Sequence, residues 1–311
     1  MNSILFAYFL HHFNLGQQNN SLAAAQTQNV VSTTNAVLSV EHEQATVRSF
    51  PRGSTRIPFL NLSLKTSCDE DVILDGITVR HRGLGSAQDI SSVYLLADNR
   101  RITRGRTVPK DGEVHFNIRN IVIKACSTKL ITVAADISAD AAIDSQHGFY
   151  IDDAKDVSTN SNVYLSARPD LKQNNVYRTA TKKAGTINVT YANISSRIKY
   201  GLRRKVMRFL LKADSVSNHK ISAITISNRG SAKDDNLKNI FIETGTQVIT
   251  PVVSQMNGDS IDLIFDPPFI LNKNQERLFS VRADVMAKRS RTVQLIIEEP
   301  SDIISIPVSG R

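Results

Sequence analysis

The chain of 311 residues contains two cysteines, Cys68 and Cys126, whose thiols are the first groups to consider for chemistry. A thiol serves as a nucleophile, as a metal ligand or as half of a disulfide. No histidine lies beside either cysteine in the repeat described below, so a catalytic thiol with a neighbouring base is disfavoured. Both cysteines fall in turns that an immunoglobulin-like topology places at one pole, so a disulfide is geometrically plausible, and it would stabilise the fold by roughly 3–4 kcal/mol. Two unpaired thiols in exposed turns are the alternative.

The seven histidines and the acidic residues form no known catalytic or metal-binding motif. The sequence has neither H-E-x-x-H nor H-x-x-E-H, no serine-nucleophile elbow, no P-loop and no dinucleotide fingerprint. His81 and His115 fall at strand positions and are interpreted as surface or edge residues. We therefore predict no catalytic site, no metal site and no cofactor, and we expect that the chain is not an enzyme. Three acidic clusters are interpreted as solvated turn residues, with calcium ligation as the alternative: Asp69-Glu70-Asp71, Asp152-Asp153 and Asp234-Asp235.

Basic side chains gather in two regions and are candidates for binding. A formal net charge of +9 and a pI near 9.6 mean that the surface attracts polyanions, such as acidic glycan, cell-wall polymer, anionic lipid or nucleic acid. Nucleic acid is the least favoured, because no recognition helix or aromatic strip accompanies the basic residues. Solvated loop faces are the alternative interpretation. The candidates are Arg100, Arg101, Arg104, Arg106 and Lys110 in the first half of the chain, and Arg197, Lys199, Arg203, Arg204, Lys205 and Arg208 in the second.

The N-terminus carries a short apolar run. A helix of this length cannot span a bilayer, but the run has the length of a signal-peptide core, and Ala23 to Ala25 offer an A-x-A cleavage site. No Lys or Arg precedes the run and a long polar spacer follows it, which argues against a signal. The second interpretation is a hydrophobic assembly or anchor segment, and the third is a disordered extension or a wrongly assigned start. The candidate assembly residues are Ile4, Leu5, Phe6, Tyr8, Phe9 and Leu10.

The segments expected to position these residues occur twice in the sequence, as an internal repeat. Residues 59–118 overlay residues 206–265 at a constant offset of 147, and the match resumes after a one-residue insertion, with Asp136 on Asp284. The cysteines have no counterparts, because Ser215 and Asn274 stand at their positions. Matched sets include Leu60/Leu62/Leu64 with Met207/Phe209/Leu211, Ile77-Thr78-Val79 with Ile224-Thr225-Ile226, and Arg82-Gly83 with Arg229-Gly230.

Short runs with alternating apolar and polar residues, separated by turn residues, predict an all-β chain. We predict two tandem antiparallel β-sandwich domains, immunoglobulin-like or jelly-roll, related by internal duplication. Gly83 and Gly230 are expected in turns that need a positive φ, or in bulges. The predicted boundaries are a leader and polar linker at 1–36, the first domain at 37–166, a linker at 167–186 and the second domain at 187–311.

The repeat pattern resembles the tandem sandwich repeats of exported bacterial and archaeal surface proteins. The resemblance covers about residues 38–165 and 187–305 and is carried by strand-core patterns, such as Pro58-Phe59-Leu60-Asn61-Leu62-Ser63-Leu64-Lys65 and Leu130-Ile131-Thr132-Val133-Ala134-Ala135-Asp136-Ile137. It implies a surface-layer, adhesin or filament setting, secreted or at the cell surface, and it transfers no catalytic residue.

Two functions follow as predictions. The first is a non-enzymatic structural subunit that self-assembles into a surface layer or filament through exposed edge strands and the N-terminal segment. The alternative is an adhesion module that binds an anionic polymer through the basic residues. The expected partners are accordingly further copies of the chain or other surface proteins, or an anionic polymer, and no transmembrane span is expected in the mature chain.

Overall fold

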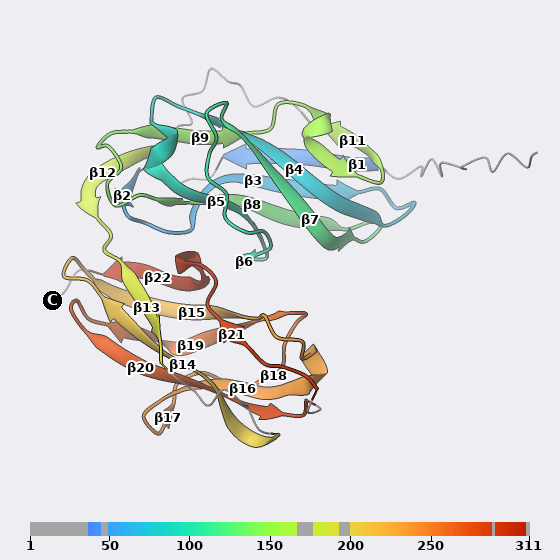
Figure 1. Ribbon diagram of the computed structural model, residues 1–311. Helices are drawn as coiled ribbons and strands as arrows, with labels where there is room; N and C mark the ends of the chain where they lie inside the picture. The colour runs from blue at the N-terminus through green and yellow to red at the C-terminus, as the bar shows by residue number, and fades with distance from the viewer. Residues whose placement is uncertain (1–36, 45–48, 167–176, 193–199, 288–289, 309–311) are drawn as a thin grey trace, which may run out of the picture. The chain divides into compact units, whose positions relative to one another are not determined.

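The computed structural model describes residues 37–44, 49–166, 177–192, 200–287 and 290–308 (Figure 1). The candidate assembly segment at Ile4–Leu10 lies outside these residues, as do Arg197 and Lys199. Within the described residues the chain is all-β and forms two sandwiches in tandem, each with two sheets. The predicted fold class is confirmed.

The first sandwich consists of two mostly antiparallel sheets, whose buried side chains form one core. The strands of the first sheet, in spatial order, are β11 (Asn162–Leu165), β1 (Val37–Gln44), β3 (Ile57–Thr66), β8 (Thr128–Ile137), β5 (Ile90–Ala97) and β6 (Arg100–Arg101). In the second sheet β4 (Val72–Arg82) pairs with β7 (Glu113–Ile123) on one side and with β10 (Val157–Thr159) and β9 (Gln146–Tyr150) on the other, and β9 continues to β12 (Tyr177–Lys183) and β2 (Ser49–Arg52).

The second sandwich repeats this arrangement. Its first sheet runs β13 (Ile187–Tyr191), β14 (Gly201–Ala213), β20 (Glu276–Val285), β16 (Leu237–Thr244) and β17 (Gln247–Val248), with β18 (Val253–Gln255) also paired to β16. Its second sheet places β15 (Asn218–Asn228) between β19 (Ser260–Leu271) and the pair β21 (Leu295–Ile296) and β22 (Ile303–Val308).

The path of the chain between the sheets resembles a jelly roll. From β3 to β9 the successive main strands alternate between the two sheets, and from β14 to β21 they do the same. An immunoglobulin constant-type sandwich instead keeps several consecutive strands in one sheet. Of the two sandwich types predicted, the crossing connections therefore favour the jelly roll.

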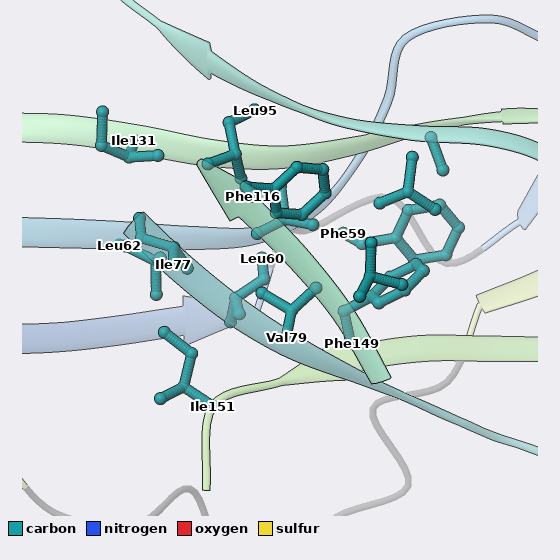
Figure 2. Close-up of a cluster of buried hydrophobic side chains, with 14 of the residues drawn as sticks. Phe59, Leu60, Leu62, Ile77, Val79, Leu95, Phe116, Ile131, Phe149 and Ile151 are labelled. Carbon is teal, nitrogen blue, oxygen red and sulfur yellow. The ribbon is translucent and has the colours of Figure 1, made fainter. Parts of the chain in front are cut away.

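Period-two alternation explains why these segments are strands with one buried face. In β3, Leu60, Leu62 and Leu64 are fully buried, whereas the residues between them face outward. Figure 2 shows this core, in which the rings of Phe59 and Phe149 meet edge to face with centroids 5.4 Å apart. The second sandwich has a separate core of the same kind around Phe209 and Phe279. Each sandwich thus buries its own apolar cluster.

The duplication is visible strand by strand. The segment from the 3-10 turn at Ala87–Asp89 through β5 and β6 recurs, shifted by 147, as the turn at Asp234–Asn236 with β16 and β17. β8 recurs as β20 with a shift of 148. The register between β15 and β19 changes between Ile221 and Ala223, opposite the Asp266-Pro267-Pro268 segment, which includes the cis peptide bond Asp266–Pro267. The one-residue insertion that the sequence alignment required therefore lies in β19.

In both sandwiches the duplicated aspartate accepts a hydrogen bond from an arginine with positive φ. Arg56 and Arg203 both have positive φ, at 57° and 50°, a region that non-glycine residues occupy only when their surroundings hold them there. The N–H of Arg56 donates to Asp136 Oδ1 at 2.9 Å, and the N–H of Arg203 donates to Asp284 Oδ1 at 2.7 Å. Each aspartate thus fixes a left-handed residue at the start of a core strand, directly before β3 in the first sandwich and near the beginning of β14 in the second, so its repetition reflects folding.

Gly83 and Gly230 are required for close approach of two backbones. A Cβ on Gly83 would lie 2.1 Å from the carbonyl oxygen of Gln146, and one on Gly230 would lie 2.2 Å from that of Thr292. Gly83 also has a φ of 121°, as the sequence led us to expect. The close approach is common to both copies, and it is the stronger reason for glycine.

The predicted linker at 167–186 is wrong in its second half. Residues 177–183 form β12, which pairs with β9 and β2 in the first sandwich. Only Tyr177 and Thr179 of this strand are buried, while the basic side chains of Arg178, Lys182 and Lys183 are exposed. Two inward residues in a basic segment give too weak an alternation to stand out from a linker.

Candidate interaction surfaces

The structure joins Cys68 and Cys126 in a disulfide, with the two Cα atoms 4.3 Å apart. The turn after β3 and the turn before β8 meet there, because the two strands are antiparallel neighbours in one sheet. Asp71 supports the same turn, since its carboxylate accepts the N–H of Ala125 at 2.9 Å and pairs with Lys124 at 2.7 Å. This carboxylate therefore has a structural role in place of the calcium ligation considered above.

Arg101 is the basic candidate that the structure removes from any external binding surface. Its side chain is only 6% exposed, and its guanidinium binds Asp302 in a fork, with Nε–Oδ1 at 3.0 Å and Nη2–Oδ2 at 2.9 Å. Glu299 accepts a further contact at 3.1 Å. A buried arginine with these partners is committed within the chain, so its assignment to polymer binding is wrong. The neighbouring Arg100 also bonds inside the chain, to the carbonyl of Asn257 at 3.0 Å and to the hydroxyl of Ser260.

The other basic candidates of the first sandwich lie in the loop that follows β6. Arg104, Arg106 and Lys110 are exposed. None of the three forms an ion pair with another described residue. The loop that carries them contacts β5 through the isolated antiparallel bridge between Val93 and Arg106.

The basic candidates of the second sandwich share one strand. Arg203, Arg204 and Lys205 are exposed side by side on β14, and Arg208 is partly buried on the same strand. The guanidinium of Arg203 lies over the ring of Phe241, 5.9 Å from its centroid. Arg282 is adjacent on β20 and pairs with Glu243 at 2.7 Å. Among the described residues, no carboxylate forms an ion pair with Arg203, Arg204 or Lys205, so their charges face solvent.

A histidine pair in the first sandwich was missed by the sequence analysis. His81 on β4 and His147 on β9 face each other, with Nε2 and Nδ1 3.1 Å apart. His147 is fully buried, and its Nε2 lies 3.0 Å from the hydroxyl of Ser145 and 3.5 Å from Asp89. Burial and the neighbouring His147 lower the pKa of His81 to about 4, although Asp89 opposes this shift. His81 is thus a buried-pair residue and not a simple edge residue, whereas His115 is exposed as expected.

This pair has the residue types of a hydrolase but not the arrangement. Asp89 and His147 both contact Ser145, and the hydroxyl of Ser145 donates to Asp89. In a serine triad the carboxylate instead holds the histidine nitrogen that faces away from the serine. That nitrogen here faces His81, so the hydroxyl is held as a structural donor.

Three strands border their sheets with one side unpaired among the described residues. They are β7 in the first sandwich and β19 and β22 in the second. Each has an exposed apolar residue, namely Val122, Ile264 and Ile306 respectively. Unpaired edges of this kind are templates for pairing with another chain.

A groove of about 430 Å³ opens on the second sandwich between the β16–β17 hairpin and β19. Val248 and Ile270 line it and are 50% and 46% exposed. Phe265 and Phe269 also line it, with ring centroids 6.1 Å apart. The inserted Asp266-Pro267-Pro268 segment forms one wall. The groove therefore belongs to the part of the second copy that departs from the first.

The described ranges contain no group of three or more His, Cys, Asp or Glu residues placed to hold a metal ion. In the same ranges no helix has the length and apolar character needed to cross a membrane.

Comparison with known proteins gives little further information. No protein-family model matches the chain, and no curated protein matches its sequence. Among solved structures, the type II cohesin dyad from the adaptor ScaA scaffoldin of Acetivibrio cellulolyticus aligns over 85% of this chain and 88% of its own, with 9% identity and a TM-score of 0.23. An anti-sigma factor domain-containing protein aligns over 80% and 83%, with 9% identity and a TM-score of 0.17. Similarity at these TM-scores carries no conclusion about function.

Proposed function

We propose that the chain is a non-enzymatic structural protein outside the cytoplasm, whose copies self-assemble into a surface layer or extracellular filament. The observation that carries this proposal is the set of open sheet edges with exposed apolar residues on β7, β19 and β22. Long unpaired edges with apolar side chains are an aggregation hazard in a monomer and a docking template in an assembly.

The disulfide supports the proposed location. Cys68 and Cys126 are bonded, and disulfides persist in oxidising compartments such as the cell exterior. The sequence resemblance to repeats of exported surface proteins points the same way. The unused serine, histidine and aspartate arrangement around Ser145 favours a structural protein over a hydrolase.

Electron microscopy of the purified chain tests self-assembly. We expect ordered polymers from the full chain and their loss when residues 1–36 are removed. The shortened protein should still fold, because all described strands begin at or after Val37 and both cores consist of residues beyond that point. Circular dichroism of the shortened protein should retain the β signal of the full chain. Dispersed monomers from both proteins would contradict the proposal.

A second candidate function is adhesion to an anionic polymer. The observation that favours it is the exposed and unpaired row Arg203, Arg204 and Lys205 on β14. Such a row can release counterions from a polyanion, which gives a salt-dependent affinity. Arg101 is excluded from this surface because it is buried against Asp302.

Retention on heparin measures this second function. We expect the triple variant Arg203→Ser, Arg204→Ser and Lys205→Ser to elute at a clearly lower salt concentration than the parent chain, because three exposed positive charges are lost. The charge-matched control replaces Arg178, Lys182 and Lys183 by serine, which are exposed basic residues of β12 and are not binding candidates. If both triple variants shift equally, net charge alone explains retention and β14 is not a binding surface.

A further inference from the structure

The groove between the β16–β17 hairpin and β19 has the character of an acceptor for an apolar guest. Its volume of about 430 Å³ lies within the range of about 300–1,000 Å³ that is common for ligand sites. Val248 and Ile270 expose half or nearly half of their surface there. Asp266 is the one ionisable side chain among the described residues that line it. A guest with large apolar side chains and no charge would fit this lining.

The walls of the groove are the borders of two sheets. β17 borders one sheet of the second sandwich, and β19 borders the other. Pro267 and Pro268 have no N–H, so this part of β19 cannot extend a hydrogen-bonded ladder to a guest strand. Recognition at this wall therefore depends on side-chain packing against Phe265 and Phe269, which selects for apolar residues.

One segment of the chain itself has the required chemistry. Residues 4–10 are seven consecutive apolar residues, and no Asp, Glu, Lys or Arg occurs before Glu41. If extended, the segment presents Ile4, Phe6, Tyr8 and Leu10 on one face, because side chains alternate along a strand. Docking it would bury four large apolar side chains of the segment, and the segment itself has no charged side chain to desolvate.

The length of chain between this segment and the first described strand permits docking on another molecule. From Leu10 to Val37 the chain has 27 residue steps, which span at most about 90 Å when extended. This reach exceeds the dimensions of a sandwich of this size, so a neighbouring molecule is accessible.

We infer that the groove lined by Val248, Phe265, Phe269 and Ile270 binds the N-terminal apolar segment, residues 4–10, of a second copy of the chain. The inference rests on the proposed self-assembly and assigns its acceptor site. In the inferred complex the segment is an extended peptide, with Phe6 and Tyr8 facing Phe265 and Phe269.

Photocrosslinking of the full chain identifies both the guest and the site. Benzoylphenylalanine replaces Phe6 in one preparation and Ala7, on the opposite face, in a second. After irradiation we expect the Phe6 probe to give a product of twice the chain mass, crosslinked to residues 244–251 or 265–270, and the Ala7 probe to give much less.

A substitution in the groove provides the matched test. We expect Ile270→Asp to reduce the crosslinked product at least about tenfold, because an unpaired carboxylate would be buried under the guest. Val216→Asp is the control, since Val216 is 46% exposed like Ile270, does not line the groove and lies in the turn between β14 and β15, away from the open sheet edges. Both variants change an exposed side chain, and circular dichroism should show unchanged folding.

The other outcomes separate failure of the inferred acceptor site from failure of self-assembly. A crosslink to the groove within a single chain would show that the guest belongs to the same molecule. Polymers that form while the Phe6 probe crosslinks elsewhere, or that resist Ile270→Asp, would leave self-assembly standing and remove the groove as its acceptor. A groove crosslink between two chains without polymers would support the acceptor site and contradict the surface layer or filament.

Discussion

Replacing the disulfide with the residues of the second copy, Cys68→Ser and Cys126→Asn, is expected to lower the free energy of unfolding of the first sandwich by about 4 kcal/mol. The bridge spans 58 residues, and closing a loop of that length removes about this much conformational entropy from the unfolded chain. Urea denaturation of the parent and the double variant, followed by circular dichroism, measures the difference. Dithiothreitol should destabilise the parent by a similar amount.

The choice of Asn at position 126 isolates the covalent bond from the local backbone. Cys126 has a φ of 57°, and Asn274 at the equivalent place in the second sandwich has a φ of 59°. Asparagine tolerates this left-handed conformation better than most residues. A matched pair with Cys126→Ala should therefore lose somewhat more stability than the pair with Asn. If the Ser/Asn variant unfolds at the same urea concentration as the parent, the bridge does not restrain the unfolded chain.

Acidification is expected to destabilise the first sandwich through its histidine pair. The pKa of His81 is lowered by burial and by His147 to about 4, against 6.5 in the unfolded chain, and burial lowers the pKa of His147 as well. Between pH 6.5 and pH 4 the unfolded chain therefore binds more protons, so stability is present at neutral pH and is lost as the pH falls. Because His81 is partly exposed, solvent screening reduces the expected loss from this residue to about 2 kcal/mol.

A buried aspartate acts in the opposite direction over nearly the same range. Burial raises the pKa of Asp136 to about 6, while Tyr94, whose hydroxyl donates to it at 2.6 Å, partly opposes the shift. Since the folded chain then binds the extra proton, this group adds stability as the pH falls from 6 towards 3.8. The pH dependence of the parent alone therefore mixes two effects of opposite sign.

Comparison with His81→Asn separates the two effects. Asn228 occupies the equivalent position in the second sandwich, so the variant copies a residue that this sheet already accommodates. From pH 7 to pH 4.5, the free energy of unfolding of the parent should fall by about 2 kcal/mol more than that of His81→Asn, because the contribution of Asp136 is common to both. His115→Asn, at an exposed position on β7, should behave like the parent. An identical pH dependence of the parent and His81→Asn would show that the pair does not titrate as described.

The fold could be predicted from the sequence because its strands carry a strong local signal. The alternation at Leu60, Leu62 and Leu64 marks a half-buried strand without any knowledge of its partners. The offset of 147 then identified the second copy, and the slip to 148 required the insertion that lies at Pro267 and Pro268 in β19. β12 escaped notice because its inward face has only Tyr177 and Thr179.

The contacts that depend on strand register could not be predicted in this way. His81 and His147 are 66 positions apart and meet only because β4 pairs with β9. Arg101 and Asp302 are 201 positions apart, and in the sequence Arg101 does not differ from the exposed Arg104 nearby. Local composition identifies a basic residue, but which carboxylate it meets is decided by the tertiary fold.

The insertion in β19 also means that a row of molecules joined through the groove would have two different ends. Because the groove beside Pro267 and Pro268 occurs on the second sandwich and the apolar segment precedes the first, donor and acceptor are different surfaces of one chain. A contact between unlike surfaces is heterologous, and unless its rotation closes a ring it continues from molecule to molecule. One end of such a row would always present a vacant groove and the other a vacant segment. Growth, capping and attachment at the two ends would then be chemically distinct events.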